Sequence, residues 1–97
     1  MIVVTGSILA KPESVDELLA LSLAHVRRSR AEAGCVSHAV HRDVEDPLRL
    51  VFVETWTDRP ALLAHFAVPA SREFVEAATA LAAERPVIDI YDAEPWK

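Results

Sequence analysis

One carboxylate, one indole and two imidazoles are the side chains of this sequence whose types and spacing suit chemistry. Glu54 and Trp56 stand two residues apart in the run LVFVETW. Its β-branched and aromatic content predicts a strand, so both side chains point to the same face. An ionised glutamate is rarely buried unless it is paired. His38 precedes this strand and His65 follows it. These residue types fit proton transfer, in which an imidazole accepts or donates the proton and a carboxylate orients the imidazole.

The register between two neighbouring strands decides whether His38 meets Glu54. The segment VEDPL is rich in turn-forming residues and predicts the turn that joins these strands. If Asp43 faces Arg49 across that turn, His38 lies opposite Glu54, whereas a slip by one residue would place them on opposite faces. Such a pair is either charge-assisted or holds a neutral imidazole in one tautomer. The same register predicts two more pairs on this face, Val40 with Phe52 and Val36 with Trp56.

Each candidate residue also has an interpretation without catalysis. Glu54 can hydrogen-bond backbone groups or a residue of a partner chain, and Trp56 can fill the core with its N–H on a carbonyl. His65 can bridge a helix and a loop, and His38 can be a polar residue in a half-open cavity. Tyr91 either lines the cavity from the last strand or lies at a seam between two subunits.

No spacing along the chain indicates a metal or cofactor site. His41 lies on the opposite strand face from His38, so the two cannot bind one metal ion from the same face. Cys35 follows a helix end and is expected to be a small buried strand residue. The sequence holds no glycine-rich phosphate loop and no nucleotide-binding fingerprint. We therefore expect no cofactor and no metal.

Composition limits the partners and the compartment. The 97 residues fit one domain, and the net charge of −5 argues against binding to nucleic acid or to an anionic membrane. A single cysteine cannot form an intramolecular disulfide, which favours a reducing, cytoplasmic setting. No charged and apolar leader precedes the first strand, and no apolar run reaches the ~20 residues of a membrane span.

Four strands are predicted from apolar and alternating runs, at residues 2–10, 35–43, 49–57 and 87–93. Ser14 and Glu17 have the spacing of a capping box, which begins a helix that runs to about Ala33. Gly34 then ends this helix in the left-handed conformation. Two further helical pieces follow, one capped by Asp58 that reaches about Ala67 and one capped by Ser71.

The element order β-α-β-β-α-β is typical of an α+β fold, the ferredoxin-like split βαβ sandwich. We expect an antiparallel sheet with the first and last strands in the middle and both helices on one face. The strands carry apolar residues on both faces, and a soluble monomer would expose the second face as a large patch. A two-fold homodimer that packs sheet on sheet would cover it. Trp96, beyond the last strand, would pack against the other subunit and stabilise the dimer.

The stretch EAGCVSHAVHRDVEDPLRLVFVETWTDRPALLAHF, from Glu32 to Phe66, resembles the core of the antibiotic biosynthesis monooxygenase (ABM) domain family. The shared features are a Glu-x-Gly-Cys helix end, a strand with Glu-x-Trp, and a downstream histidine followed by an aliphatic or aromatic residue. The likeness covers nearly the whole chain, so one ABM-like domain is expected over residues 1–97. The resemblance implies a dimeric α+β barrel with a pocket between sheet and helices in each subunit.

Several activities occur in the family that this chain resembles. They include cofactor-free oxygenation of quinols and anthrones, isomerisation of a sugar-phosphate signal, and haem degradation. His38 stands where many members carry Tyr or Phe, and no second histidine follows Pro69. Residues 71–81 hold no histidine, although the haem-degrading members use one on that helix as the iron ligand. Haem degradation is therefore the less favoured activity.

The leading hypothesis is a cofactor-independent monooxygenase that acts on a small electron-rich aromatic with molecular oxygen. His65 or His38 would be the base or the donor to an oxyanion, and Glu54 would orient it. The substrate would be enclosed by three aromatic side chains, Trp56, Phe52 and Phe66. The alternatives are a proton-transfer isomerase that uses the same residues, or a dimeric ligand-binding domain without turnover.

Overall fold

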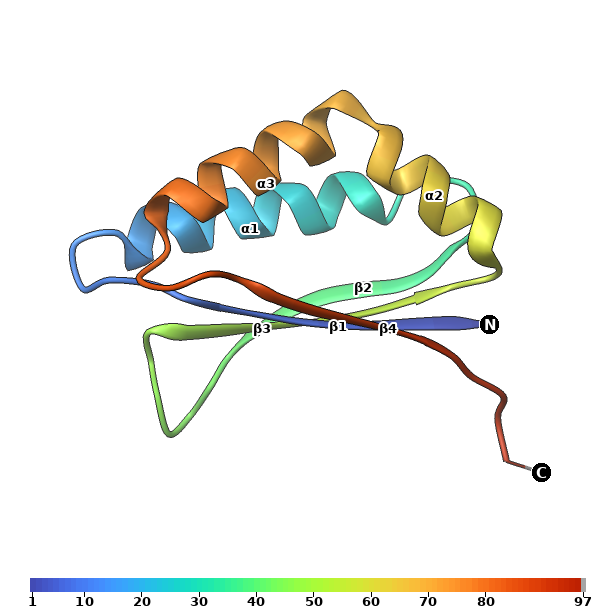
Figure 1. Cartoon of the computed structure of the whole chain (residues 1–97), viewed down its shortest axis with the longest axis horizontal. Helices are drawn as coiled ribbons and strands as arrows, with labels where there is room; N and C mark the ends of the chain where they lie inside the picture. Colours follow the sequence, from blue (N-terminus) through green and yellow to red (C-terminus); the bar gives the residue numbers. More distant parts are fainter. Residues whose placement is uncertain (97) are drawn as a thin grey trace.

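The computed structural model describes residues 1–96 and contains four strands and three helices (Figure 1). In chain order the elements are β1 (Ile2–Leu9), α1 (Val15–Ser29), β2 (Cys35–Arg42), β3 (Arg49–Trp56), α2 (Arg59–Ala67), α3 (Pro69–Leu81) and β4 (Val87–Asp92). The predicted ferredoxin-like α+β order is confirmed, with the second helical segment divided into α2 and α3. Pro69 lies in the first turn of α3 and accounts for that division.

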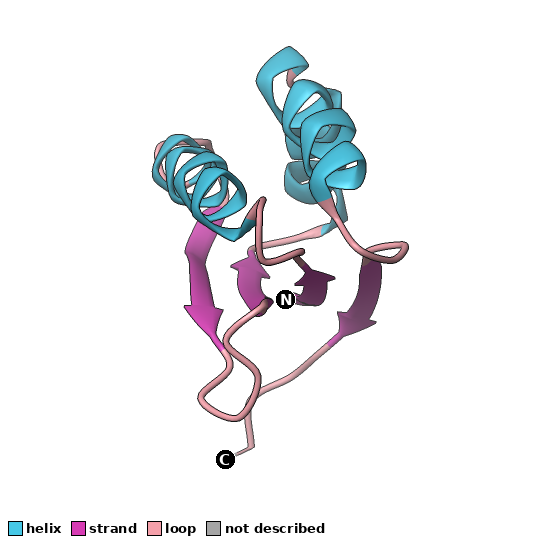
Figure 2. Ribbon diagram, turned by 90° about the vertical axis from the view of Figure 1, so that its left-hand side faces the viewer, coloured by secondary structure: helices cyan, strands magenta, loops and turns pink. Residues whose placement is uncertain are grey.

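The four strands form one antiparallel sheet in the order β2-β3-β1-β4. The prediction that the first and last strands occupy the middle is wrong, because β1 and β3 are central and β4 is an edge strand. The reason is that each crossover connection skips one strand. The connection from β1 to β2 skips the position that β3 occupies, and the connection from β3 to β4 skips β1. All three helices cover one face, as expected (Figure 2).

The helix-covered face of the sheet holds two buried apolar groups. The first contains Ile8, Ala10, Leu18, Val26, Leu50, Phe52 and Ala78. The second contains Ile2, Val4, Trp56 and Leu62. Along β3, Phe52 belongs to the first group and Trp56 to the second, so Glu54 is held between them on the same face. The predicted face of β3 is therefore confirmed, and the polar site is built between two apolar supports.

The pairing of β2 with β3 places His38 opposite Glu54 and Val40 opposite Phe52, as predicted. The predicted pairing of Val36 with Trp56 is wrong, because a β-bulge between Cys35 and Ser37 places Cys35 opposite Trp56. Val36 is the extra residue of the bulge and is 59% exposed. The bulge lets the small thiol, instead of the valine, pack beside the second apolar group.

The helix ends differ from two predictions. The capping box does not form: the Ser14 hydroxyl accepts the Lys11 N–H at 3.1 Å and donates to the Leu81 carbonyl at 2.8 Å. Ser14 thereby joins the start of α1 to the end of α3. Helix α1 ends at Ser29, earlier than expected, and α3 begins at Pro69, before the predicted cap at Ser71. The cap by Asp58 is confirmed, because its carboxylate accepts the Ala61 N–H.

Gly34 has the predicted left-handed conformation, with φ +82°. A Cβ at this position would lie 2.5 Å from Cβ of Ala61 and 2.9 Å from Oγ1 of Thr57. We therefore expect Gly34→Ala to lower the free energy of unfolding by more than the ~1–2 kcal/mol that the left-handed conformation costs a non-glycine residue. Urea unfolding measures this. Gly6→Ala, whose Cβ would meet its nearest atom at 3.4 Å, is the matched control and should cost less.

Within residues 1–96, no helix combines the length and the apolar character that crossing a membrane requires.

Candidate functional site

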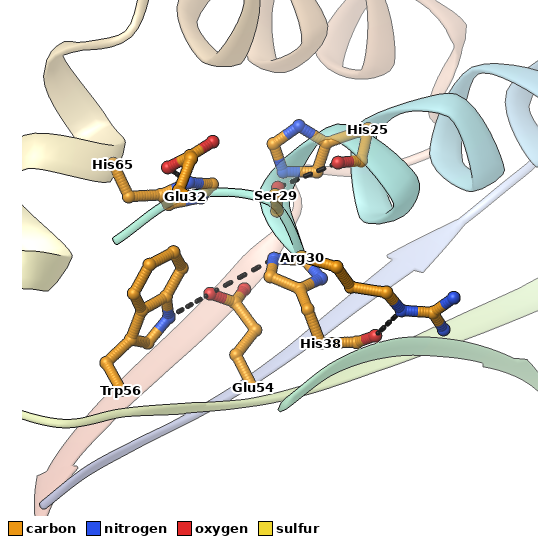
Figure 3. Close-up of polar contacts among 8 residues, drawn as sticks. All are labelled: His25, Ser29, Arg30, Glu32, His38, Glu54, Trp56 and His65. Carbon is orange, nitrogen blue, oxygen red and sulfur yellow. Dashed lines mark hydrogen bonds and ion pairs between the residues drawn. The ribbon is translucent and has the colours of Figure 1, made fainter. Parts of the chain in front are cut away.

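Four elements bring buried polar side chains together under the helices (Figure 3). Glu54 comes from β3, His38 from β2, His65 from α2 and His25 from α1. His38 is 2% exposed and Glu54 is 7% exposed. Polar groups this deeply buried require partners. The contacts that they make therefore define what the site can do.

Glu54 is the central acceptor of the site. Its Oε1 accepts the indole N–H of Trp56 at 2.9 Å and lies 3.3 Å from Nε2 of His38. Burial by itself acts to raise the pKa of Glu54, but the His38 and Trp56 contacts and the nearby charge of His65 outweigh it. The net effect is a lowered pKa, so Glu54 is a carboxylate at neutral pH. The sequence-predicted convergence of His38, Glu54 and Trp56 is present.

His38 is fixed from the backbone side, because its carbonyl accepts Nε–H of Arg30 at 2.9 Å. Its two ring nitrogens are both buried and have no aligned hydrogen-bond partner among residues 1–96. The 3.3 Å approach of Nε2 to Glu54 is close enough for an ion pair. Its direction departs from hydrogen-bond geometry, and we therefore treat it as an electrostatic contact.

His65 is oriented by a residue that sequence reasoning did not single out. Its Nδ1 lies 2.8 Å from Oε1 of Glu32, in the segment that follows α1. A carboxylate only accepts, so Nδ1 carries the proton and Nε2 keeps its lone pair. The imidazole also lies against the indole of Trp56, with ring centroids 4.7 Å apart. His65 is thus held in one tautomer and one orientation.

His25 is the second residue that sequence reasoning missed. Its ring stacks on Phe74 at 4.2 Å and lies 5.3 Å, centroid to centroid, from both His38 and His65. The signal was its spacing: His25 is seven residues after Leu18, on the buried side of α1. Burial, followed by the neighbouring His38 and His65, lowers the pKa of His25 to about 3. The imidazole is therefore neutral at physiological pH.

This burial predicts a pH-dependent stability. His25 has a pKa of about 3 in the folded protein and 6.5 as its ordinary value, so between these values the unfolded chain binds more protons. Stability must then fall as pH decreases. We expect the metal-free protein to lose about 2 kcal/mol between pH 7.5 and pH 5 from this residue, measured by urea unfolding with a chelator present.

The matched variant is His25→Gln, which keeps a polar side chain and removes the titration. The free energy of unfolding of this variant should change little between pH 7.5 and pH 5. Glu54, whose lowered pKa lies under its ordinary value of 4.5, contributes only at more acidic pH. If the free energy of unfolding of the variant fell with pH as much as that of the wild type, the assignment of the effect to His25 would be contradicted.

Three imidazoles approach closely enough to hold a metal ion. Ring nitrogens of His25, His38 and His65 all lie within 4.8 Å of one another. The interpretation that no spacing indicates a metal site compared residues along the chain, chiefly His38 with His41. Spacing along the chain could not reveal the cluster of His25, His38 and His65, because the three histidines come from three separate elements.

A cavity of about 730 Å³ adjoins the site. Its lining includes Glu54, His65, His25, Phe52, Phe66 and Phe74. Trp56 is fully buried behind His65 and supports the wall. Tyr91 pairs with Val3 on the helix-free face, because the register of β4 on β1 turns it away from the cavity. Its predicted place in the cavity is therefore wrong, and its place at a subunit seam stays a prediction.

Cys35 is half-buried at the start of β2. Burial raises the pKa of its thiol, and the charges of Glu54 and Glu32 act in the same direction. A thiol with a raised pKa is a poor nucleophile. Cys35 is a strand residue as predicted, but its predicted full burial is wrong, because it is only partly buried.

The profile of the family described as antibiotic biosynthesis monooxygenase matches residues 1–77. The uncharacterized protein sll1783 of Synechocystis sp. is 40% identical over 90 residues, which are 93% of this chain. The chain spans 61% of the length of that relative.

Solved structures give the same result. The crystal structure of an antibiotic biosynthesis monooxygenase is 32% identical, with a TM-score of 0.90 over 98% of this chain and 100% of the other. A protein from Deinococcus radiodurans, described as a candidate member of the same class, is 25% identical, with a TM-score of 0.95 over 100% of this chain and 96% of the other. The chain therefore belongs to the antibiotic biosynthesis monooxygenase family.

Proposed function

We propose that the protein is a monooxygenase that uses molecular oxygen to oxidise a small electron-rich aromatic, such as a quinol or an anthrone. One observation carries the proposal: His65, which Glu32 orients, lines a cavity whose other walls include three phenylalanine side chains. The cavity volume suits a ligand of two or three rings. Membership of the family supports an oxygenase of this general kind.

His65 is the base in the proposed reaction. Its Nε2 is free to accept the proton of a substrate hydroxyl or of an activated methylene, while Glu32 stabilises the imidazolium that forms. His38 is the poorer candidate, because the residues that line the cavity include His65 and not His38. Glu54 acts as a positioning residue that holds Trp56 and His38 in place.

Deprotonation makes the substrate an electron donor. The anion transfers one electron to oxygen, and recombination forms a carbon–oxygen bond. For an anthrone methylene, loss of water then leaves a carbonyl, so one oxygen atom enters the product and the other leaves as water. The substrate supplies all the electrons. The apolar walls keep water away from the anion and strengthen the electrostatic interactions around it.

Oxygen consumption with an anthrone and a naphthoquinol tests the proposal. We expect protein-dependent oxygen uptake, and one labelled atom in the anthrone product under ¹⁸O₂. Turnover that proceeds equally fast without oxygen would refute it. Uptake of deuterium from heavy water without oxygen consumption would instead favour the isomerase. A ligand that binds without turnover would favour a binding domain.

We also propose that the protein is a homodimer. The helix-free face exposes apolar side chains, including Val53, Val87 and Tyr91 at 40%, 55% and 53%. Trp96 is fully exposed in the single chain. A second copy packed sheet against sheet would bury these groups. The single cysteine further supports a cytoplasmic location for this dimer.

A further inference from the structure

We propose that His25, His38 and His65 bind one divalent transition-metal ion of the class that prefers imidazole, such as Zn²⁺, Fe²⁺ or Co²⁺. The three histidines come from α1, β2 and α2, and all are buried. Their ring centroids form a triangle with sides of 5.3, 5.3 and 5.6 Å. Three of the four histidines in the chain therefore face one point in the core.

The unsatisfied nitrogens are the first argument for an ion. In the part of the chain that the structure describes, Nδ1 of His25 and both ring nitrogens of His38 are buried without a hydrogen-bond partner. Leaving such groups unpaired in the core costs about 1–3 kcal/mol each. Three closely spaced imidazoles are a poor arrangement for packing alone. A metal ion would give each ring a partner for one lone pair.

The surrounding carboxylates are the second argument. A metal-binding histidine typically donates its other ring N–H to a carboxylate, and Glu32 accepts from Nδ1 of His65 at 2.8 Å in this way. Glu54 places Oε1 3.3 Å from Nε2 of His38, where it can serve as a fourth ligand. The two carboxylates together would balance the two positive charges of the ion.

The donor set selects the kind of metal. Imidazole suits Zn, Cu, Fe and Ni, whereas Mg²⁺ and Ca²⁺ prefer sites built from oxygen ligands. Nitrogens bound to Zn²⁺ at about 2.0–2.1 Å in a tetrahedron lie about 3.4 Å apart, so the rings must close by at most about 1.4 Å from their present spacing. His25, His65 and Glu54 also line the cavity. With the three imidazoles and Glu54 as ligands the tetrahedron is filled, so the ion would lie at the wall of the cavity without an open position.

Metal binding does not depend on the proposed oxidation, because it is measured without substrate. Both would use Nε2 of His65, so the ion and the transferred proton compete for one lone pair. A bound ion would therefore block the proposed base, so the oxidation is assayed on the metal-free chain, and either proposal can fail without the other.

The first test uses the wild-type chain without a polyhistidine tag, stripped with a chelator and dialysed. We expect Co²⁺ to bind one ion per chain with a visible absorption band, and Zn²⁺ to displace it, while Mg²⁺ and Ca²⁺ do not. Imidazole NMR signals of His25, His38 and His65 should shift on Zn²⁺ addition, and those of His41, on the opposite face of β2, should not. Absence of binding, or shifts confined to His41, would overturn the proposal.

The second test uses substitutions in chains whose circular dichroism shows that they remain folded. His25→Ala, His38→Ala and His65→Ala should each weaken Co²⁺ binding by at least 100-fold, and the matched His41→Ala should leave it unchanged. Glu32→Gln should cost about 10- to 100-fold, as expected for a carboxylate that orients a ligand. Equal affinity in His25→Ala and His41→Ala would overturn the three-histidine site. If the alanine variants do not fold, the NMR test on wild type decides alone.

Discussion

Replacing His65 with glutamine will slow the oxygen-dependent turnover of an aromatic substrate by about 100- to 10,000-fold, the usual contribution of a positioned base. Glutamine keeps a polar group near Trp56 but cannot accept a proton at neutral pH. The loss should fall on kcat, while KM changes little, because the cavity walls remain. Steady-state oxygen uptake measures both constants.

Two further variants separate the chemistry from the structure. His41→Gln changes a histidine on the helix-free side of β2 and should leave turnover unchanged. Glu32→Gln keeps the shape of the pair but weakens the stabilisation of the imidazolium. The pH profile of kcat should then shift to lower pH, because the neutral amide no longer stabilises the imidazolium of His65. A His65→Gln enzyme with wild-type kcat would refute the role of His65.

The second large effect concerns the helix-free face. Val53 lies on the central strand β3 and is 40% exposed in the single chain, so Val53→Lys would be harmless in a monomer. In the proposed dimer the lysine is buried at a sheet-on-sheet interface, and two-fold symmetry introduces it twice. Each buried unpaired ammonium costs several kcal/mol. We therefore expect the variant to be unfolded or aggregated, as judged by circular dichroism and sedimentation.

The control is Val44→Lys in the β2–β3 turn, where the side chain is 98% exposed. This variant should behave as wild type. The wild-type unfolding midpoint should rise with protein concentration, because an obligate dimer gains stability by mass action. A folded wild-type monomer at micromolar concentration would contradict the proposed dimer.

The local parts of the site were predictable from sequence because short-range rules determine them. Strand alternation places Glu54 and Trp56 on one face, and a turn of fixed length sets the register that brings His38 opposite Glu54. The cap at Asp58 fixes where α2 begins and therefore which side of it carries His65. Each of these relations spans fewer than about 20 residues.

The remaining parts depend on contacts between distant elements. His25 was missed because the buried side of a helix is recognised in a sequence by its apolar residues. A histidine at such a position is assigned to the exposed side, and only the packing of α1 on the sheet shows that His25 is buried. Glu32 reaches His65 only because α1 ends early, at Ser29. The orientation of Tyr91 follows from the register of β4 on β1, which no turn fixes.

The bulge at Val36 has a consequence for how the chain can vary in length. Val36 is the one residue by which β2 exceeds its partner between Cys35 and Ser37. Loss of that residue would leave a regular ladder in which His38 still faces Glu54. A deletion between His38 and the turn would instead rotate the imidazole to the helix-free face. The start of β2 is therefore a place where relatives can gain or lose a residue, while the segment from His38 to the turn must keep its length.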